Sequence, residues 1–218
     1  MKVEVIKKIL LDELVAQVRR VPLMQRAGDG SEIRVYQNAS IFLRRTDPRE
    51  VNPTSFYLVR GNLQFQRNLR ATLMEQGIDT LQLEGALEIR VDDADQVWAL
   101  MPPVVEVTSR KVRYIPAAGE IDYEKTQQVQ IPVINDGVHR VWIAREADEF
   151  FNGLWVARAD PAFPFYAHPN SWDDMREVDA VPSSRAAKKL YSKEDCYALY
   201  RDFGVLGCGA PRPLGPKG

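Results

Sequence analysis

Four residues in one short stretch, VINDGVHRVWIARE, are of types found where proteins bind or react with a phosphate group. Arg140 can donate two parallel, charge-assisted hydrogen bonds to phosphate oxygens. His139 can donate to an anion or exchange a proton near neutral pH. Gly137 lets a phosphate approach the backbone where a Cβ atom would obstruct it. Asp136 repels a phosphate and instead suits a metal ligand, a general base or a helix N-cap.

The residues on either side predict how this stretch is held. The apolar run VQIPVI, residues 129–134, is typical of a strand buried on both faces, and the residues after Gly137 fit a short helix. The first amide N–H groups of such a helix lack internal partners and favour an anion. A purely structural interpretation explains the same residues, since Asp136 can cap the helix, Gly137 can permit a tight turn, and Arg140 can pair with a glutamate. Spacing alone leaves both interpretations open.

Residues 131–146 resemble the strand-Asp-Gly-x-His-Arg-helix signature of the ParB and sulfiredoxin superfamily. The form D-G-x-H-R is that of the ParB-fold free serine kinases and of the DGQHR-type proteins of DNA-modification systems. The resemblance implies a turn that binds a nucleotide phosphate through Gly137, His139 and Arg140. Val138 stands where sulfiredoxin has its catalytic cysteine, which excludes thiol repair. Val138 and His139 replace the glutamate and second arginine of chromosome-partitioning ParB proteins, so a CTP switch is not expected.

The function favoured by this resemblance is a module that binds the phosphate of a nucleotide or of a nucleic-acid backbone, within a bacterial multi-component system that handles or defends nucleic acid and includes protein partners. One alternative is an NTP-dependent phosphotransferase, which would use Asp136 or Glu106 as its acid or base and a nucleoside triphosphate with Mg²⁺. Another is a non-catalytic assembly subunit. Whether the protein is an enzyme stays open at this point.

A second group of candidate residues lies in the stretch PFYAHPNSWDDM. Tyr166, His168 and Trp172 could contact a base or sugar, because every nucleobase offers a flat face to an aromatic ring. The alternative is a loop that packs across a sheet with its aromatic side chains buried. The two histidines of the chain lack a third ligand at a standard spacing, so no metal site is expected.

Charge and composition exclude several classes of protein. The chain has 218 residues, with 29 basic and 30 acidic side chains, so no overall positive field indicates nucleic acid. The charges within the first twenty residues interrupt any apolar run, which argues against a signal peptide or a membrane span. Cys196 and Cys208 have no CxxC spacing, and free thiols indicate a cytoplasmic protein.

The hydrophobic pattern predicts an α+β (mixed α/β) protein, and the resemblance implies that it has a ParB/sulfiredoxin-like core. We expect residues 1–68 to form an N-terminal helix and small β elements, residues 69–160 the core, and residues 161–218 an extended segment, a C-terminal helix and a Gly/Pro tail. The expected elements are helices over 6–18, 63–74 and 192–204, strands over 33–37, 40–45 and 56–59, and a meander over 79–116. Arg201, in the last helix, is expected at the surface.

Overall fold

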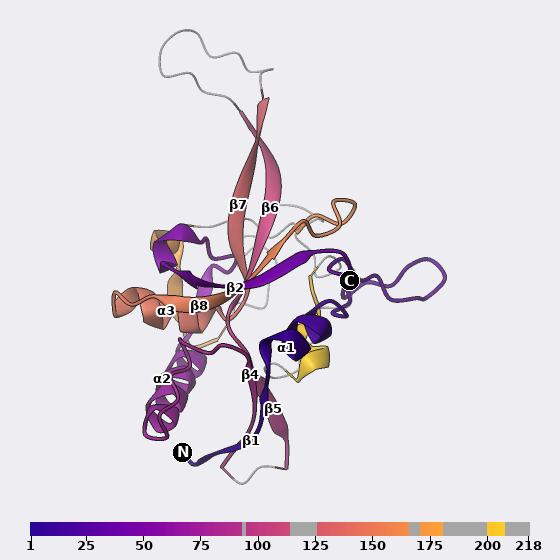
Figure 1. The fold of residues 1–218 in the computed structure, drawn as a ribbon. Helices are drawn as coiled ribbons and strands as arrows, with labels where there is room; N and C mark the ends of the chain where they lie inside the picture. Colours follow the sequence, from indigo (N-terminus) through magenta and orange to yellow (C-terminus); the bar gives the residue numbers. More distant parts are fainter. Residues whose placement is uncertain (93–94, 114–125, 166–170, 181–199, 208–218) are drawn as a thin grey trace.

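The computed structural model describes residues 1–92, 95–113, 126–165, 171–180 and 200–207, and only the backbone of 110–113 (Figure 1). Helices are interspersed with strands that pair over long sequence distances, which confirms the predicted α+β class. The strands are β1 (Val3–Ile9), β2 (Ser40–Thr46), β3 (Tyr57–Val59), β4 (Ala86–Val91), β5 (Val97–Leu100), β6 (Val104–Arg113), β7 (Thr126–Asp136), β8 (Phe151–Ala157) and β9 (Arg176–Val178). The helices are α1 (Leu11–Val18), α2 (Arg60–Met74) and α3 (Val138–Glu146), with short 3₁₀ turns η1 (Pro48–Glu50), η2 (Trp172–Asp174) and η4 (Phe203–Leu206).

A four-stranded sheet in the order β2-β8-β6-β7 positions the candidate turn. β8 pairs antiparallel with β2 and parallel with β6, but the pairing with β6 ends at Glu106. Beyond that residue β6 and β7 continue together as a hairpin, which projects from the rest of the molecule in Figure 1. The division into three segments stays a prediction, and this sheet joins β2 of the first segment to β8 of the second.

The strand predicted to be buried on both faces is β7, at the edge of this sheet. Val133 and Ile134 are buried, as expected for its second half. Gln130 is exposed, and Val129 and Ile131 are only half-buried, so the prediction is wrong for the first half of the run, which lies in the projecting hairpin. The apolar residues of the run did not indicate how far the strand extends beyond the core.

A second sheet of three strands, in the order β1-β4-β5, corrects the prediction of a helix over residues 6–18. Residues 3–9 instead form β1, which pairs antiparallel with β4, and the helix begins only at Leu11. Ile6, assigned to the buried face of the predicted helix, is 42% exposed. Val3, Val5 and Ile9 are β-branched and favour a strand once β4 offers a pairing edge. The predicted meander over 79–116 does contain three strands, but β6 belongs to the other sheet.

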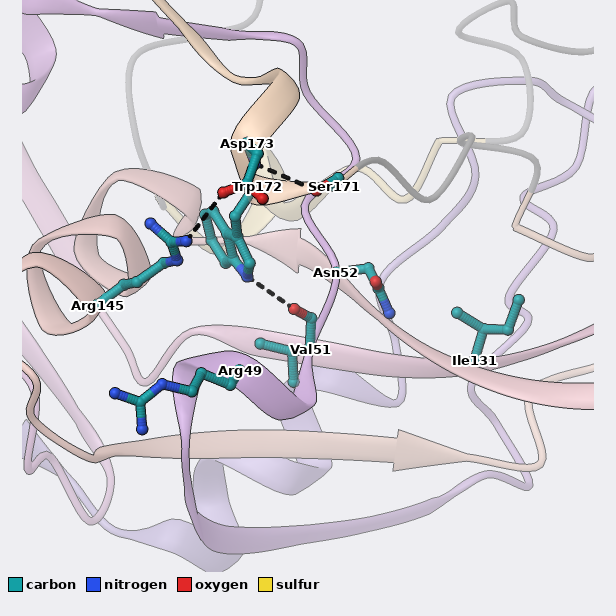
Figure 2. Close-up of a pocket in the computed structure, with 8 residues that line it drawn as sticks. All are labelled: Arg49, Val51, Asn52, Ile131, Arg145, Ser171, Trp172 and Asp173. Atoms are coloured by element: carbon teal, nitrogen blue, oxygen red, sulfur yellow. Dashed lines mark hydrogen bonds and ion pairs between the residues drawn. The ribbon is translucent and has the colours of Figure 1, made fainter.

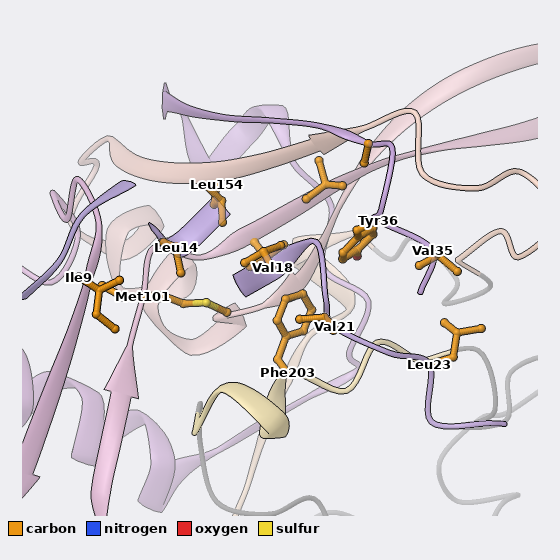
Figure 3. Close-up of a cluster of buried hydrophobic side chains, with 14 residues drawn as sticks. Ile9, Leu14, Val18, Val21, Leu23, Val35, Tyr36, Met101, Leu154 and Phe203 are labelled. Carbon is orange, nitrogen blue, oxygen red and sulfur yellow. The ribbon is translucent and has the colours of Figure 1, made fainter. Parts of the chain in front are cut away.

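The core that joins these parts is built around α1 (Figure 3). Leu14 and Val18 of this helix pack in one cluster with Leu154 of β8 and with Phe203 from η4 near the C-terminal end. Tyr36 also lies in this cluster. Residues 35–38 form a turn and not the predicted strand, because Val35 and Tyr36 are neighbours that are both buried, which a one-sided strand does not allow.

The predicted helix over 63–74 is α2, which begins slightly earlier, at Arg60. Leu63, Leu69 and Leu73 are buried along one face, as the spacing predicted. The helix ends at Met74, and Gly77, three residues further on, has φ +76° and donates its N–H to the Met74 carbonyl. This left-handed residue is the expected helix C-terminal signal. For the predicted helix over 192–204, residues 192–199 lie outside the described part of the chain, and η4 begins at Phe203.

Candidate functional site

The predicted strand-turn-helix is present, with β7 ending at Asp136 and α3 beginning at Val138. Gly137 is the N-cap residue and has φ +88°. A Cβ atom built on it would lie 2.9 Å from Pro103 Cβ and 3.0 Å from Arg140 Nη2. The turn therefore requires glycine for reasons internal to the fold, namely a left-handed backbone and close packing against Pro103.

The beginning of α3 lies beside the beginning of α2. The N–H of Val59, the N-cap residue of α2, donates to His139 Nε2 at 3.2 Å. Further along, Arg67 of α2 pairs with Glu146 at 2.7 Å, and Arg70 of α2 lies 2.5 Å from Glu149. In each of these contacts the two residues are separated by nearly the same number of positions along the chain. The contacts therefore advance along both helices together, so the helices are parallel and their N-termini lie side by side.

Neither N-terminus is neutralised within its helix. The N-cap residues Val59 and Gly137 provide no side-chain cap, and neither helix has an acidic residue in its first turn. The first amide N–H groups of each helix have no partner in the helical ladder. Each helix end also carries a positive partial charge of about half a unit from its macrodipole. Two such ends lie side by side here, which favours an anion between or near them, and the Asp136 carboxylate directly before Gly137 supplies one negative charge at the end of α3.

His139 is held as a neutral imidazole. Burial lowers the pKa of His139 below its usual value of 6.5, with Asp136 opposing this shift and Arg140 adding to it. The Nε2 atom accepts a hydrogen bond from Val59, which requires the ring proton on Nδ1. In this arrangement His139 positions the two helix ends, and its role toward a phosphate stays a prediction.

The side chain of Arg140 points into the protein. Its residue is 6% exposed, its Nη1 donates to the Met101 carbonyl, and its Nη2 lies 3.5 Å from Asp136 Oδ2. The Asp136 side chain is 22% exposed. Arg140 and Asp136 thus form a nearly neutral pair at the start of α3. Direct contact between Arg140 and a phosphate stays a prediction, and it requires the guanidinium to exchange part of its present contacts.

Glu106 lies apart from solvent, in a buried network under the sheet. Its carboxylate accepts hydrogen bonds from Arg201 Nη2 at 2.7 Å and Nε at 3.0 Å, from Tyr36 Oη at 2.5 Å, and from Asn135 Nδ2 at 2.8 Å. Burial raises the pKa of Tyr36 well above its usual value, and the Glu106 carboxylate adds to this effect. The described geometry gives Glu106 the role of counter-ion to Arg201, and its catalytic role stays a prediction.

The expectation that Arg201 lies at the surface is wrong. Its side chain is fully buried, with 0% exposure, and it also donates to the Phe163 carbonyl at 2.9 Å. No pattern in the sequence indicates this pairing, because Glu106 and Arg201 are far apart along the chain. The network reaches the candidate turn through Asn135, which directly precedes Asp136.

Of the three residues predicted to contact a base or sugar, Tyr166 and His168 lie outside the described residues. Trp172 is 8% exposed, and its indole N–H donates to the carbonyls of Pro48 and Val51. Its ring lies 5.9 Å from that of Trp142 between centroids. Trp172 also lines a pocket of about 450 Å³ (Figure 2), whose described lining does not include the residues of the turn.

Among the described residues, no group of three or more His, Cys, Asp and Glu side chains is arranged to hold a metal ion. No helix in that part of the chain is long and apolar enough to cross a membrane.

The fold is of the α+β class, and two parallel helix N-termini meet at the end of one sheet strand. A family model described as the ParB CE domain matches residues 13–176, and the chain belongs to this family. The matched region contains the turn, α2 and α3, whereas Arg201 lies beyond it. No curated protein and no solved structure matches the chain.

Proposed function

We propose that the protein binds the phosphate groups of a nucleotide or of a nucleic-acid backbone at the paired N-termini of α2 and α3. The observation that carries this proposal is the hydrogen bond from Val59 to His139, which brings together two helix ends that have no side-chain cap. Helix N-termini are anion-binding sites because their amide N–H groups and their macrodipoles both favour negative charge. Two adjacent ends favour a group with more than one negative charge.

The backbone around the site is open on the side of α2. Gly61, in the first turn of α2, is exposed, and a Cβ atom built on it would meet no atom within 4 Å. Its amide N–H is one of those left without a partner in the helical ladder. Arg60, which precedes it, is 56% exposed and pairs with Asp179, which is 86% exposed. Exposed ion pairs of this kind are worth about 0 to 1 kcal/mol, so Arg60 can turn toward a phosphate at little cost.

His139 and Arg140 have distinct roles in this proposal. His139 holds the two helix ends in register through Val59, and its neutral ring leaves the N–H at Nδ1 as a further donor. Arg140 contributes a positive charge next to Gly137 and exchanges part of its contact with Asp136 for a phosphate oxygen. Membership of the ParB CE domain family is compatible with nucleotide, nucleic-acid or assembly roles. A place in a bacterial system that handles nucleic acid rests on the D-G-x-H-R resemblance.

Phosphotransfer with a nucleoside triphosphate and Mg²⁺ remains the second candidate. Its support is the location of Asp136, a carboxylate that is partly exposed at the turn. Turnover that depends on Mg²⁺ and is lost in Asp136→Asn would establish it. Binding without turnover supports the module, and the absence of any phosphate ligand, together with a stable assembly with a protein partner, supports an assembly subunit.

A substitution at Gly61 tests the proposal because it should raise the stability of the fold and lower the affinity for phosphate. Gly61→Asp places a carboxylate in the first turn of α2, where it stabilises the helix by about 0.3 to 1 kcal/mol. The same charge repels a phosphate, so affinity for pyrophosphate, ATP or short single-stranded DNA should fall by at least about tenfold, or 1.4 kcal/mol. Gly61→Asn is the matched control, since it has nearly the same shape without the charge.

Thermal-shift measurements with each of these ligands, with and without Mg²⁺, provide the readout. We expect wild type and Gly61→Asn to be stabilised by the same ligand, and Gly61→Asp to melt at a higher temperature without ligand but to respond less to it. If Gly61→Asp responds as strongly as Gly61→Asn, the ligand lies elsewhere and the proposal fails.

A further inference from the structure

Within the described part of the chain, the outer edge of β7 is unpaired along the projecting hairpin. β7 is the last strand of its sheet, and Asn52 covers the edge only near Val133. The N–H of Asn52 donates to the Pro132 carbonyl at 3.0 Å, and the N–H of Ile134 donates to the Asn52 carbonyl at 2.9 Å. The chain itself therefore uses this edge as a pairing surface over a very short length.

These two hydrogen bonds fix which residues of β7 face outward. Main-chain groups alternate between the two sides of a strand, so Gln130, Gln128 and Thr126 have the same outward phase as Pro132 and Ile134. The pairing of β6 with β7 continues without a shift from Val105 to the end of the strand. Among the described residues, no strand pairs with this outer side of β7 between Thr126 and the contact with Asn52. A hairpin of two strands is marginally stable by itself and gains from a third strand.

The pocket of Figure 2 lies where this open edge meets the body of the protein. It has a volume of about 450 Å³ and is lined by Ile131 of β7, by Asn52, and by two arginines, Arg49 and Arg145. Figure 2 shows both guanidinium groups on one side of the Trp172 ring, with Asn52 and Ile131 on the other. A strand that extends along β7 toward the body would thus end at a pocket lined by two arginines and by the carboxylate of Asp173.

Both arginines have counter-ions that can be replaced. Arg145 lies 3.2 Å from Asp173, whose side chain is 86% exposed. Arg49 pairs with Asp148, which is 77% exposed, and with Asp47 at 3.4 Å. The ion pairs with the exposed carboxylates Asp173 and Asp148 contribute little, so an incoming carboxylate can take their place, whereas Asp47 is only 25% exposed and stays beside Arg49. An arginine gives a carboxylate two parallel hydrogen bonds, which favours this group as the ligand.

We infer that an extended, acidic segment of a partner protein adds to the outer edge of β7 over residues 126–130 and places a carboxylate in the pocket between Arg49 and Arg145. The main-chain groups of the edge recognise a peptide, and the pocket recognises its acidic side chain. A second copy of the chain fits less well. Its own β7 offers threonine and glutamine over 126–130 and no carboxylate for the two arginines.

A proline at residue 128 tests the role of the edge. Pro132 already occupies a position of the same phase, so the hairpin accepts Gln128→Pro, whereas a strand added outside loses one donor and meets the proline ring. We would select a random dodecapeptide library displayed on phage against the wild-type chain, and then synthesise the enriched peptides. The expected peptides contain an Asp or Glu, and their affinity falls by at least about tenfold in Gln128→Pro.

The role of the pocket is tested with substitutions that remove the charge of each arginine. In Arg49→Gln and Arg145→Gln, affinity should fall for a peptide with Glu and stay unchanged for the same peptide with Gln. Arg34→Gln is the matched control, because Arg34 is an exposed arginine paired with Glu32 and lies outside the pocket. Circular dichroism of each variant before binding confirms that the fold is kept.

Three results would overturn the inference. The first is a selection that enriches no acidic peptide. The second is a peptide whose affinity is the same for wild type and Gln128→Pro. The third is a wild-type dimer in sedimentation experiments that Gln128→Pro dissociates, since this would assign the edge to a second copy of the chain.

Discussion

Replacing Arg201 by methionine should destabilise the protein strongly, because it leaves Glu106 buried without its counter-ion. Glu106 would retain only the donors Tyr36 and Asn135, having lost two hydrogen bonds and the positive charge. Removal of one partner of a buried ion pair typically costs about 3 to 5 kcal/mol. For a chain of this length each kcal/mol lowers the melting temperature by about 2 to 4 °C, so the expected loss is about 6 to 20 °C.

Urea denaturation of wild type and Arg201→Met measures this change as a lower midpoint at an unchanged slope. The matched control is Arg34→Met, in which the lost partner Glu32 is exposed, and the expected change is about 0.5 kcal/mol or less. Glu106→Leu combined with Arg201→Met should recover part of the loss, since no unpaired buried charge remains. Recovery stays partial because the Tyr36 hydroxyl loses its acceptor and Asn135 keeps only its hydrogen bond to Tyr36 Oη, at 2.9 Å. If Arg201→Met costs no more than Arg34→Met, the reasoning on the buried pair is refuted.

Further predictions concern the turn. The pKa of His139 is lowered by burial, so the unfolded state binds its proton first as the pH falls below 6.5, and the free energy of unfolding should decrease over this range. Denaturation midpoints at several pH values should show this decrease in wild type and a smaller one in His139→Gln; equal pH dependence would contradict the assignment of His139 as a buried neutral base. Gly137→Ala should cost about 1 to 3 kcal/mol in urea denaturation, because φ is +88° and the new Cβ would meet Pro103. Gly61→Ala, where a Cβ meets no atom, should cost nothing, and equal effects at both glycines would show that the turn is not strained.

The local features of the site could be predicted from the sequence because they depend on short-range chemistry. Asp136 and Gly137 end a strand, and a helix begins directly after them, as the pattern indicated. Gly77, just beyond the end of α2, could also be predicted from local chemistry, since a left-handed residue is favoured at that position. The prediction of an α+β fold followed from such local patterns.

The remaining features depend on contacts between distant segments, which periodicity does not contain. The partner of His139 is the N–H of Val59, and the partner of Arg201 is Glu106. Residues 6–9 were included in a helical spacing, but the edge of β4 stabilised them as part of the strand β1. In each case the deciding interaction forms only after the sheets have brought the segments together.

The most direct test of the phosphate site is an NMR titration of the ¹⁵N-labelled protein with pyrophosphate. We expect saturable shifts of the backbone amides of Gly61, Val138 and His139, at the first turns of α2 and α3, and a loss of these shifts in Gly61→Asp but not in Gly61→Asn. Shifts confined to the pocket around Arg49 and Arg145, or no saturable shift at the helix N-termini, would contradict this expectation.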